Sequence, residues 1–203
     1  MAMSDHGSAI LLPALLQRLR KEAPQSELVV SATGPQTYDE VAAGRIDLHL
    51  CPEPPPLVLE NEVLFNADFV CLFGSRQPMR NRRLTLKEYL QLPHVMILTG
   101  DGHQAMVDQP LEALGLKRRV ALRIPFFIPA LFAIAETDLV LTVPRGLATI
   151  TAGLADLGKV EPPREIRTLS WHSRLMKEAS HAWFREQIRV AAREVSAGNK
   201  KRR

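Results

Sequence analysis

The sequence predicts an α/β protein built from two similar halves. Short β-rich segments alternate along the chain with segments whose apolar residues recur at helical spacing. The alternation runs once near residues 1–70 and again near residues 74–167, and it is typical of parallel sheets covered by helices. The chain has 203 residues, of which 46% are hydrophobic, so each half is long enough to bury a core.

The first half begins with the end of a strand at residues 1–4. A helix is expected over residues 8–21, because its leucines and Ile10 form one apolar face and basic residues fill its last turns. Strands are then expected at residues 27–32 and 46–50. A short helix over residues 37–43, ended by Gly44, separates these two strands.

The connection to the second half contains two expected strands, residues 62–65 and 69–73, separated by Asn66, Ala67 and Asp68. A helix follows over residues 86–91, because Thr85 and Glu88 have the spacing of a capping box.

The second half repeats the alternation, and one further strand and helix follow it. The expected strands are residues 95–98, 119–124, 139–143 and 165–171. The expected helices are residues 104–114 (ended by Gly115), 127–135, 145–152 and 180–195. The last strand and helix belong to neither half of the alternation, and we expect them to pack against the first half.

Composition and charge exclude several classes of protein. The net charge is +4, and the last four residues, all Lys or Arg, account for it. We expect this tail to be a frayed, solvated terminus, and we do not expect the chain to bind DNA by itself. The two cysteines, the lack of a signal peptide and the lack of a long apolar run predict a cytoplasmic protein that does not enter the membrane.

The sequence also argues against catalysis. Walker, GxSxG, HExxH, CxxC and GxGxxG motifs are all missing, and the six histidines lack the spacing of a metal site. We therefore expect no catalytic residue, no metal and no cofactor.

The loops that follow the strands carry the candidate ligand-binding residues. In open α/β sheets, ligands bind at the carboxyl ends of strands, where helix N-termini present backbone N–H groups. Taken singly, each position is also explained as a helix cap or a turn; taken together they suit one small, anionic, ring-bearing ligand. The candidates are Ser4, His6, Thr33, Gly100, Asp101, His103, Phe126 and Phe127.

Five stretches of the sequence, in order, resemble the effector-binding regulatory domain of LysR-type transcriptional regulators. They lie at residues 11–24, 38–50, 69–78, 136–148 and 170–188. The resemblance implies a type 2 periplasmic-binding-protein-like fold with two Rossmann-like lobes. Lobe I would comprise residues 1–70 plus 171–203 and lobe II residues 74–167, with crossover strands at residues 69–73 and 166–171.

The same resemblance implies a function. A small-molecule effector, an aromatic carboxylate being one candidate, would bind between the lobes, and the lobe arrangement would act on a DNA-binding domain that this sequence lacks. A homodimer would form through the helix at residues 8–21, and assembly of the intact protein into a tetramer stays open. The rival hypotheses are a free-standing solute-binding protein, which would need a signal peptide, and an enzyme of this fold, which would need a catalytic motif.

Overall fold

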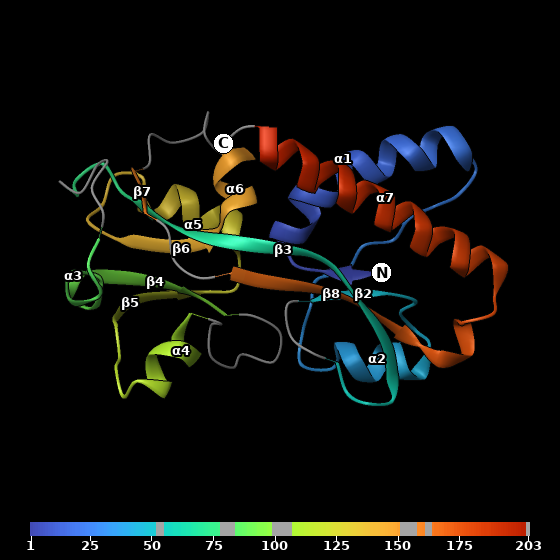
Figure 1. The fold of residues 1–203 in the computed structure, drawn as a ribbon, viewed down its shortest axis with the longest axis horizontal. Helices are drawn as coiled ribbons and strands as arrows, with labels where there is room; N and C mark the ends of the chain where they lie inside the picture. The colour runs from blue at the N-terminus through green and yellow to red at the C-terminus, as the bar shows by residue number, and fades with distance from the viewer. Residues whose placement is uncertain (52–54, 78–83, 99–106, 151–157, 161–163, 202–203) are drawn as a thin grey trace. The chain divides into compact units, whose positions relative to one another are not determined.

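The chain forms two compact units and passes between them twice (Figure 1). Unit 1 comprises Met1–Ala67 and Glu165–Arg203, and unit 2 comprises Asp68–Arg164. The first change of unit lies within strand β3 (Leu59–Phe73), and the second lies at the beginning of strand β8 (Arg164–His172). The computed structural model describes residues 1–51, 55–77, 84–98, 107–150, 158–160 and 164–201.

Unit 1 contains a mixed sheet. Strand β1 (Ala2–Met3) pairs in parallel with β2 (His49–Cys51), and β2 pairs antiparallel with β8. On its other side β1 makes a single parallel bridge, between Ala2 and Ser31. The strand expected at residues 27–32 is therefore wrong, because this segment has only the short β1 to pair with and leaves Val29 67% exposed.

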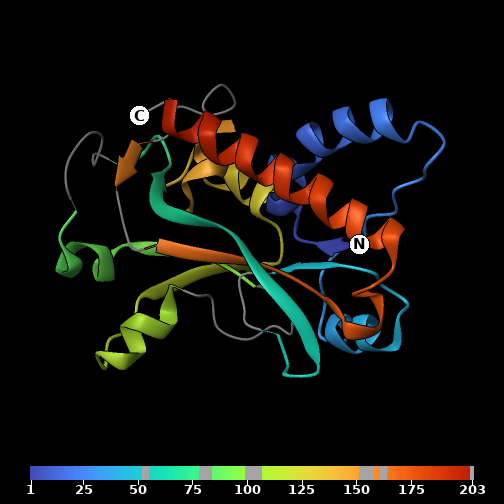
Figure 2. The same cartoon turned by 45° about the vertical axis from the view of Figure 1, so that its right-hand side comes forward.

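The helices of unit 1 cover this sheet. Helix α1 (Asp5–Glu22) lies beside the long helix α7 (Ala179–Lys201), and both pack on the same apolar face (Figures 1 and 2). Helix α2 (Thr37–Ala43) has the predicted bounds and ends at Gly44 with a φ of 75°. The fully buried side chains of the core include Leu11, Leu15, Leu48, Leu169 and Ile188.

Two expectations about the ends of unit 1 need correction. Helix α1 begins three residues earlier than predicted, because Ser4 caps it through a hydrogen bond from the Gly7 amide. Helix α7 continues to Lys201, so residues 200 and 201 belong to a helix and not to a frayed tail. A 3₁₀ helix, Ser173–Leu175, precedes α7.

Unit 2 is built on a second mixed sheet. Strand β3 pairs antiparallel with β6 (Val140–Pro144) and with the unpredicted β7 (Gly158–Val160). Strand β4 (Pro93–Ile97) is parallel to both β6 and β5 (Arg119–Ile124). Strand β5 is the last strand in the order and lies at the edge of the sheet. Its side chains alternate between exposed and half-buried.

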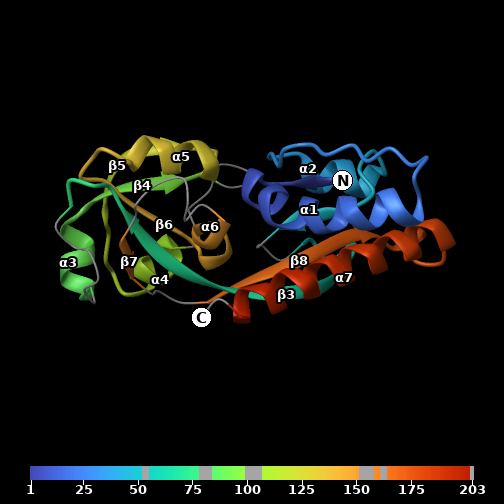
Figure 3. The same cartoon turned by 90° about the horizontal axis from the view of Figure 1, so that it is seen from above.

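Helices cover both faces of the unit 2 sheet (Figure 3). Helices α5 (Phe127–Ile134) and α6 (Arg145–Ile150) pack with the larger apolar cluster. Helix α3 (Leu86–Gln91) packs Tyr89 on the opposite face, and α4 (Asp108–Ala113) precedes β5. The predicted capping box of Thr85 and Glu88 is confirmed: each residue accepts a hydrogen bond from the other's backbone amide.

Strand β3 contradicts the predicted break at Asn66–Asp68. The strand is continuous over Leu59–Phe73. It lies between β8 and β6 in the strand order, and its pairing with β6 begins at Phe69, directly after the expected break. Pairing of the strand with its neighbours thus outweighs the local turn propensity of this segment.

Candidate functional site

The carboxyl edge of the unit 1 sheet places polar side chains at the N-terminus of α1. Ser4 follows β1, and its Oγ accepts a hydrogen bond from the Gly7 amide at 3.1 Å. Ser8 Oγ donates back to the Ser4 carbonyl at 3.0 Å. Gly7 lets the helix approach the strand, because a Cβ at this position would lie 3.3 Å from Met3 Cβ. The edge therefore combines a fixed hydroxyl with the positive end of a long helix.

The strand register brings other residues to this edge. The parallel bridge of Ala2 with Ser31 and the pairing of Met3 with Leu50 place Thr33 and Cys51 level with Ser4. Thr33 is half-buried, and the turn after it is closed by a 2.8 Å hydrogen bond from the Gly34 amide to Thr37 Oγ1. Ser4 and Thr33, both predicted, thus follow two neighbouring segments at the same edge, and their role in ligand binding stays a prediction.

Thr168 is a further residue of this edge, and sequence reasoning missed it. It pairs with Cys51 across the antiparallel ladder, and both side chains are buried. The sequence search considered only loops that lead from a strand to a helix. Thr168 lies within an antiparallel strand, so that search does not select it. A search for Ser and Thr residues in the expected strand at residues 165–171 would have identified Thr168 as a candidate.

His6 and Asp5 belong to the first turn of α1. The His6 side chain is completely buried. Its backbone amide donates to Asp5 Oδ1 at 2.9 Å, which is the role expected of an acidic residue in the first turn of a helix. The structure therefore places His6 in the packing of the helix start and Asp5 beside it.

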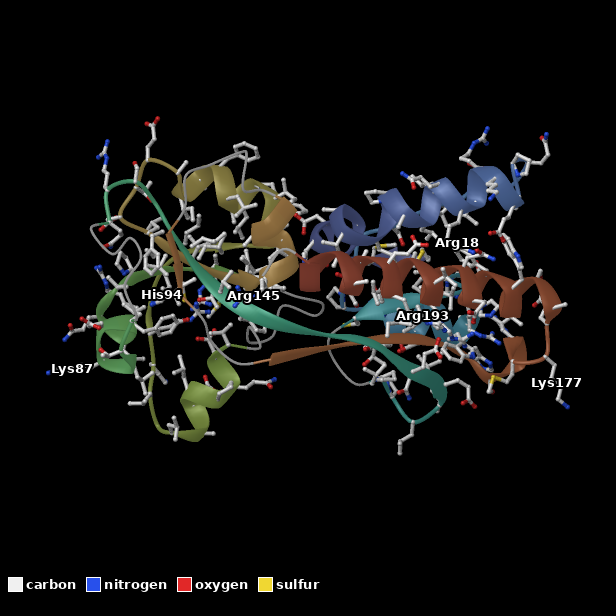
Figure 4. The ribbon with its side chains drawn as sticks, turned by 45° about the horizontal axis from the view of Figure 1, so that its top comes forward. Arg18, Lys87, His94, Arg145, Lys177 and Arg193 are labelled. Atoms are coloured by element: carbon white, nitrogen blue, oxygen red, sulfur yellow. The ribbon has the colours of Figure 1, made fainter. Side chains whose placement is uncertain are left out.

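The two phenylalanines predicted as ligand-binding residues of unit 2 lie in different environments. Phe126 precedes α5 and is 48% exposed, whereas Phe127 is 6% exposed and packs in the larger apolar cluster. Gly100, Asp101 and His103 lie outside the described residues. Arg145, labelled in Figure 4, begins α6 directly after β6.

A buried polar cluster on the α3 face of unit 2 has a structural role. Arg118 forms a bidentate pair with Asp108, at 2.7 and 2.8 Å. Tyr89 Oη lies 2.9 Å from Thr142 Oγ1, and His94 Nε2 lies 2.7 Å from the Tyr89 carbonyl. Figure 4 shows His94 among these side chains, whereas Lys87 of α3 points outwards. These hydrogen bonds join α3 and α4 to the sheet, and of the His94 ring nitrogens only Nε2 takes part, because the buried Nδ1 has no hydrogen-bond partner.

Burial controls the protonation of this cluster. It raises the pKa of Tyr89 to about 12 and that of Cys71 to about 11. It lowers the pKa of His94 to about 4. Tyr89 and Cys71 therefore stay protonated and His94 stays neutral near pH 7, which suits packing and not proton transfer.

Within the described residues, no group of three or more His, Cys, Asp or Glu side chains is placed to hold a metal ion. Nor does that part of the chain contain a helix both long and apolar enough to cross a bilayer.

The comparison with known families decides what these two units are. The LysR substrate binding domain family matches residues 1–193. The chain belongs to this family. The fold agrees: the regulatory domain of MexT, a transcriptional activator in Pseudomonas aeruginosa, superposes with a TM-score of 0.79 at 27% identity, covering 93% of this chain and 96% of MexT's. The type 2 periplasmic-binding-protein-like fold is thereby confirmed.

Relatives of this LysR domain are transcriptional regulators. The HTH-type regulator SyrM of Rhizobium meliloti (strain 1021) is 31% identical over 198 residues, covering 95% of this chain and 61% of SyrM. The HTH-type activator NagR of a Ralstonia species is 26% identical over 193 residues, covering 92% of this chain and 64% of NagR. This chain thus spans about three fifths of their length. Because LysR regulators are not enzymes, the enzyme hypothesis is discarded.

Proposed function

We propose that this LysR domain senses a small aromatic carboxylate and passes the signal to a DNA-binding domain of a longer regulator. The proposal rests above all on the strand register: the parallel bridge of Ala2 with Ser31, continued by two residues, brings Thr33 level with Ser4, the N-cap of α1. Hydroxyl donors beside a helix N-terminus bind carboxylates well, because the charge meets both donors and the helix dipole.

The exposed ring of Phe126 in unit 2 supports an aromatic ligand. Phe127, which packs in the core, would act only by fixing the position of its neighbour. A regulatory domain with the same fold, Synechocystis CcmR, was solved in complex with 2-PG; it is 15% identical to this chain and shows the fold alone.

The DNA-binding part of the proposal rests on the relatives. They are HTH-type regulators, and this chain covers about three fifths of each. An effector can change DNA binding only if it binds two arrangements of the regulator with different affinities. We propose that a homodimer forms through α1, as the resemblance implies.

Calorimetric titration tests the ligand class. We expect benzoate or salicylate to bind the purified chain and benzamide, which lacks the charge, to bind at least tenfold more weakly. Replacing Thr33 with valine should weaken carboxylate binding. The absence of heat and of thermal stabilisation across a broad panel of aromatic acids would reject the ligand class.

A matched pair of variants separates binding from folding. Ser4→Asn keeps the cap of α1, and Ser4→Asp keeps the cap but adds a negative charge at the helix N-terminus. Both variants should retain the melting temperature, whereas Ser4→Asp should bind the carboxylate at least tenfold more weakly than Ser4→Asn, since both lose the hydroxyl but only Ser4→Asp adds a like charge. Equal affinities of the two variants would place the carboxylate elsewhere.

A further inference from the structure

The turn between β8 and α7 is held by a buried arginine. The guanidinium of Arg185 donates to the carbonyls of Leu175 and Met176, at 3.2 Å each. It also lies over the Trp171 ring, 4.8 Å from the ring centroid. Arg185 is only 5% exposed and Trp171 only 4%. Arg185 therefore connects α7 to the end of the 3₁₀ helix that precedes it.

His181 holds the same guanidinium from the first turn of α7. Its Nδ1 is the hydrogen-bond partner of Arg185 Nη1, and its Nε2 lies 3.2 Å from the carbonyl oxygen of Asp47. A guanidinium can only donate hydrogen bonds and a carbonyl can only accept them. The His181 ring must therefore be neutral, with its proton on Nε2, to make both contacts.

A protonated His181 does not fit this arrangement. A charged imidazole donates from both ring nitrogens, so its Nδ1–H would face the N–H groups of Arg185. The two positive charges would meet where His181 is only 6% exposed, and water screens charges poorly there. Among the described residues, no carboxylate forms an ion pair with Arg185. Glu62, whose charge favours the Arg185 cation, is ion-paired with Arg189.

Other charged groups around His181 act in both directions. Burial lowers the pKa of His181 below its ordinary value, and the charge of Arg185 adds to this effect, whereas Asp47 and Glu178 oppose it. Lys177, in the turn itself, points outwards (Figure 4). The further charged groups that line the same cavity of unit 1 as His181 are Glu22, Glu27 and the Met1 amino group.

We propose that His181 is a pH-sensitive switch for the turn between β8 and α7. The neutral ring holds the Arg185 guanidinium against the carbonyls of the turn. The protonated ring releases the guanidinium, and the turn opens beside Trp171 while the rest of unit 1 stays folded. Local opening is favourable here because residues 176–180 are exposed and bury little apolar surface.

Acrylamide quenching of Trp171 fluorescence between pH 8 and pH 5 tests the switch. Trp183, the second tryptophan of the chain, is replaced with phenylalanine so that Trp171 alone emits. We expect the quenching constant to rise about twofold or more as the pH falls. The rise should be one reversible step with its midpoint below about pH 6.5, the ordinary pKa of histidine. Far-UV circular dichroism should stay constant through this step.

Two histidine variants identify the titrating group. His181→Gln keeps an acceptor for Arg185 and a donor for the Asp47 carbonyl but cannot titrate, so the step should disappear and the quenching constant should stay low. His172→Gln is the matched control. His172 adjoins Trp171, and its Nδ1 accepts a hydrogen bond from a backbone amide of the 3₁₀ helix, so the step should remain in this variant.

An Arg185→Gln variant adds an electrostatic check. Proton NMR of the His181 ring should show a higher pKa than in the unsubstituted chain, because the neighbouring cation is gone. An unchanged His181 pKa, a quenching constant that does not respond to pH, or a step that persists in His181→Gln or is lost in His172→Gln would overturn the inference. These measurements use neither effector nor DNA, so their outcome does not depend on the effector titrations.

Discussion

Gly74 shows how one residue can decide the packing of unit 2. It follows β3, and its amide donates to the Leu139 carbonyl at 3.2 Å. A Cβ at this position would lie 2.2 Å from the carbonyl oxygens of both Ile134 and Thr137. Ile134 ends α5 and Thr137 lies three residues beyond it. Both oxygens are backbone atoms, so a rotamer change cannot relieve the clash.

We expect Gly74→Ala to destabilise the protein by about 3 kcal/mol or more, because the chain after β3 must move away from α5. Urea unfolding followed by circular dichroism measures the loss. Gly34→Ala is the matched control: a Cβ there has no atom within 4 Å, and the change should stay within about 0.5 kcal/mol. A similar stability for the two variants would mean that the close approach at Gly74 is relaxed in solution.

At the scale of the element, α1 has two different faces. Leu11 and Leu15 are completely buried against the sheet and α7, whereas Leu16 is 42% exposed and Pro13 is also exposed. Arg18 connects α1 to α7 through a 2.8 Å hydrogen bond to Gln187. The buried face thus stabilises unit 1, and the face with Leu16 is available for a partner subunit.

If α1 forms the proposed dimer interface, Leu16→Arg should weaken self-association at least tenfold, because it buries a charge without a partner. Sedimentation velocity over a range of concentrations measures this effect. Leu57→Arg is the control, since Leu57 is fully exposed in a loop of unit 1. Unchanged association of Leu16→Arg, with its fold intact, would place the interface elsewhere.

At the scale of the whole molecule, each unit contains a buried histidine that resists protonation. His49 of β2 is 2% exposed and lies edge-on to Tyr38, with ring centroids 4.8 Å apart. Burial lowers the pKa of His49, like that of His94 in unit 2, to about 4. An unfolded chain binds a proton at each position near pH 6.5.

Stability should therefore fall as the pH drops from about 6.5 to about 4, because the unfolded state binds more protons in this window. Each histidine contributes about 3 kcal/mol that is fully present above pH 6.5. Urea unfolding at several pH values measures the slope. His49→Leu, which cannot titrate, should flatten the slope of unit 1, read by tryptophan fluorescence. A slope unchanged by this variant would show that His49 protonates equally in both states.

Elements with local signals could be predicted from the sequence. Helix α3 has its predicted bounds because Thr85 and Glu88 form the capping box within the helix itself. Helix α2 ends at Gly44 because only a glycine adopts that positive φ at little cost. The segment at residues 27–32 was predicted wrongly, since β propensity does not say whether a partner strand is long enough.

The candidate site was predictable only in part. Loop position selected Ser4 and Thr33 as candidates, because carboxyl strand ends collect at one edge of a parallel sheet, and their role as ligand contacts stays a prediction. It could not separate Phe126 from Phe127, since which of two adjacent rings enters the core depends on how α5 packs. It could not find Thr168, whose place beside Cys51 comes from antiparallel pairing with a strand far along the chain.

The amino-acid sequence by itself determined the α/β alternation, the helix caps and the family. Each of these depends on residues that are close together in the sequence, or on the order of such segments along the chain. Tertiary structure alone decided the continuity of β3 and the burial of Phe127 and His6. These depend on contacts between segments distant in sequence, where ladder hydrogen bonds and close packing outweigh local propensity.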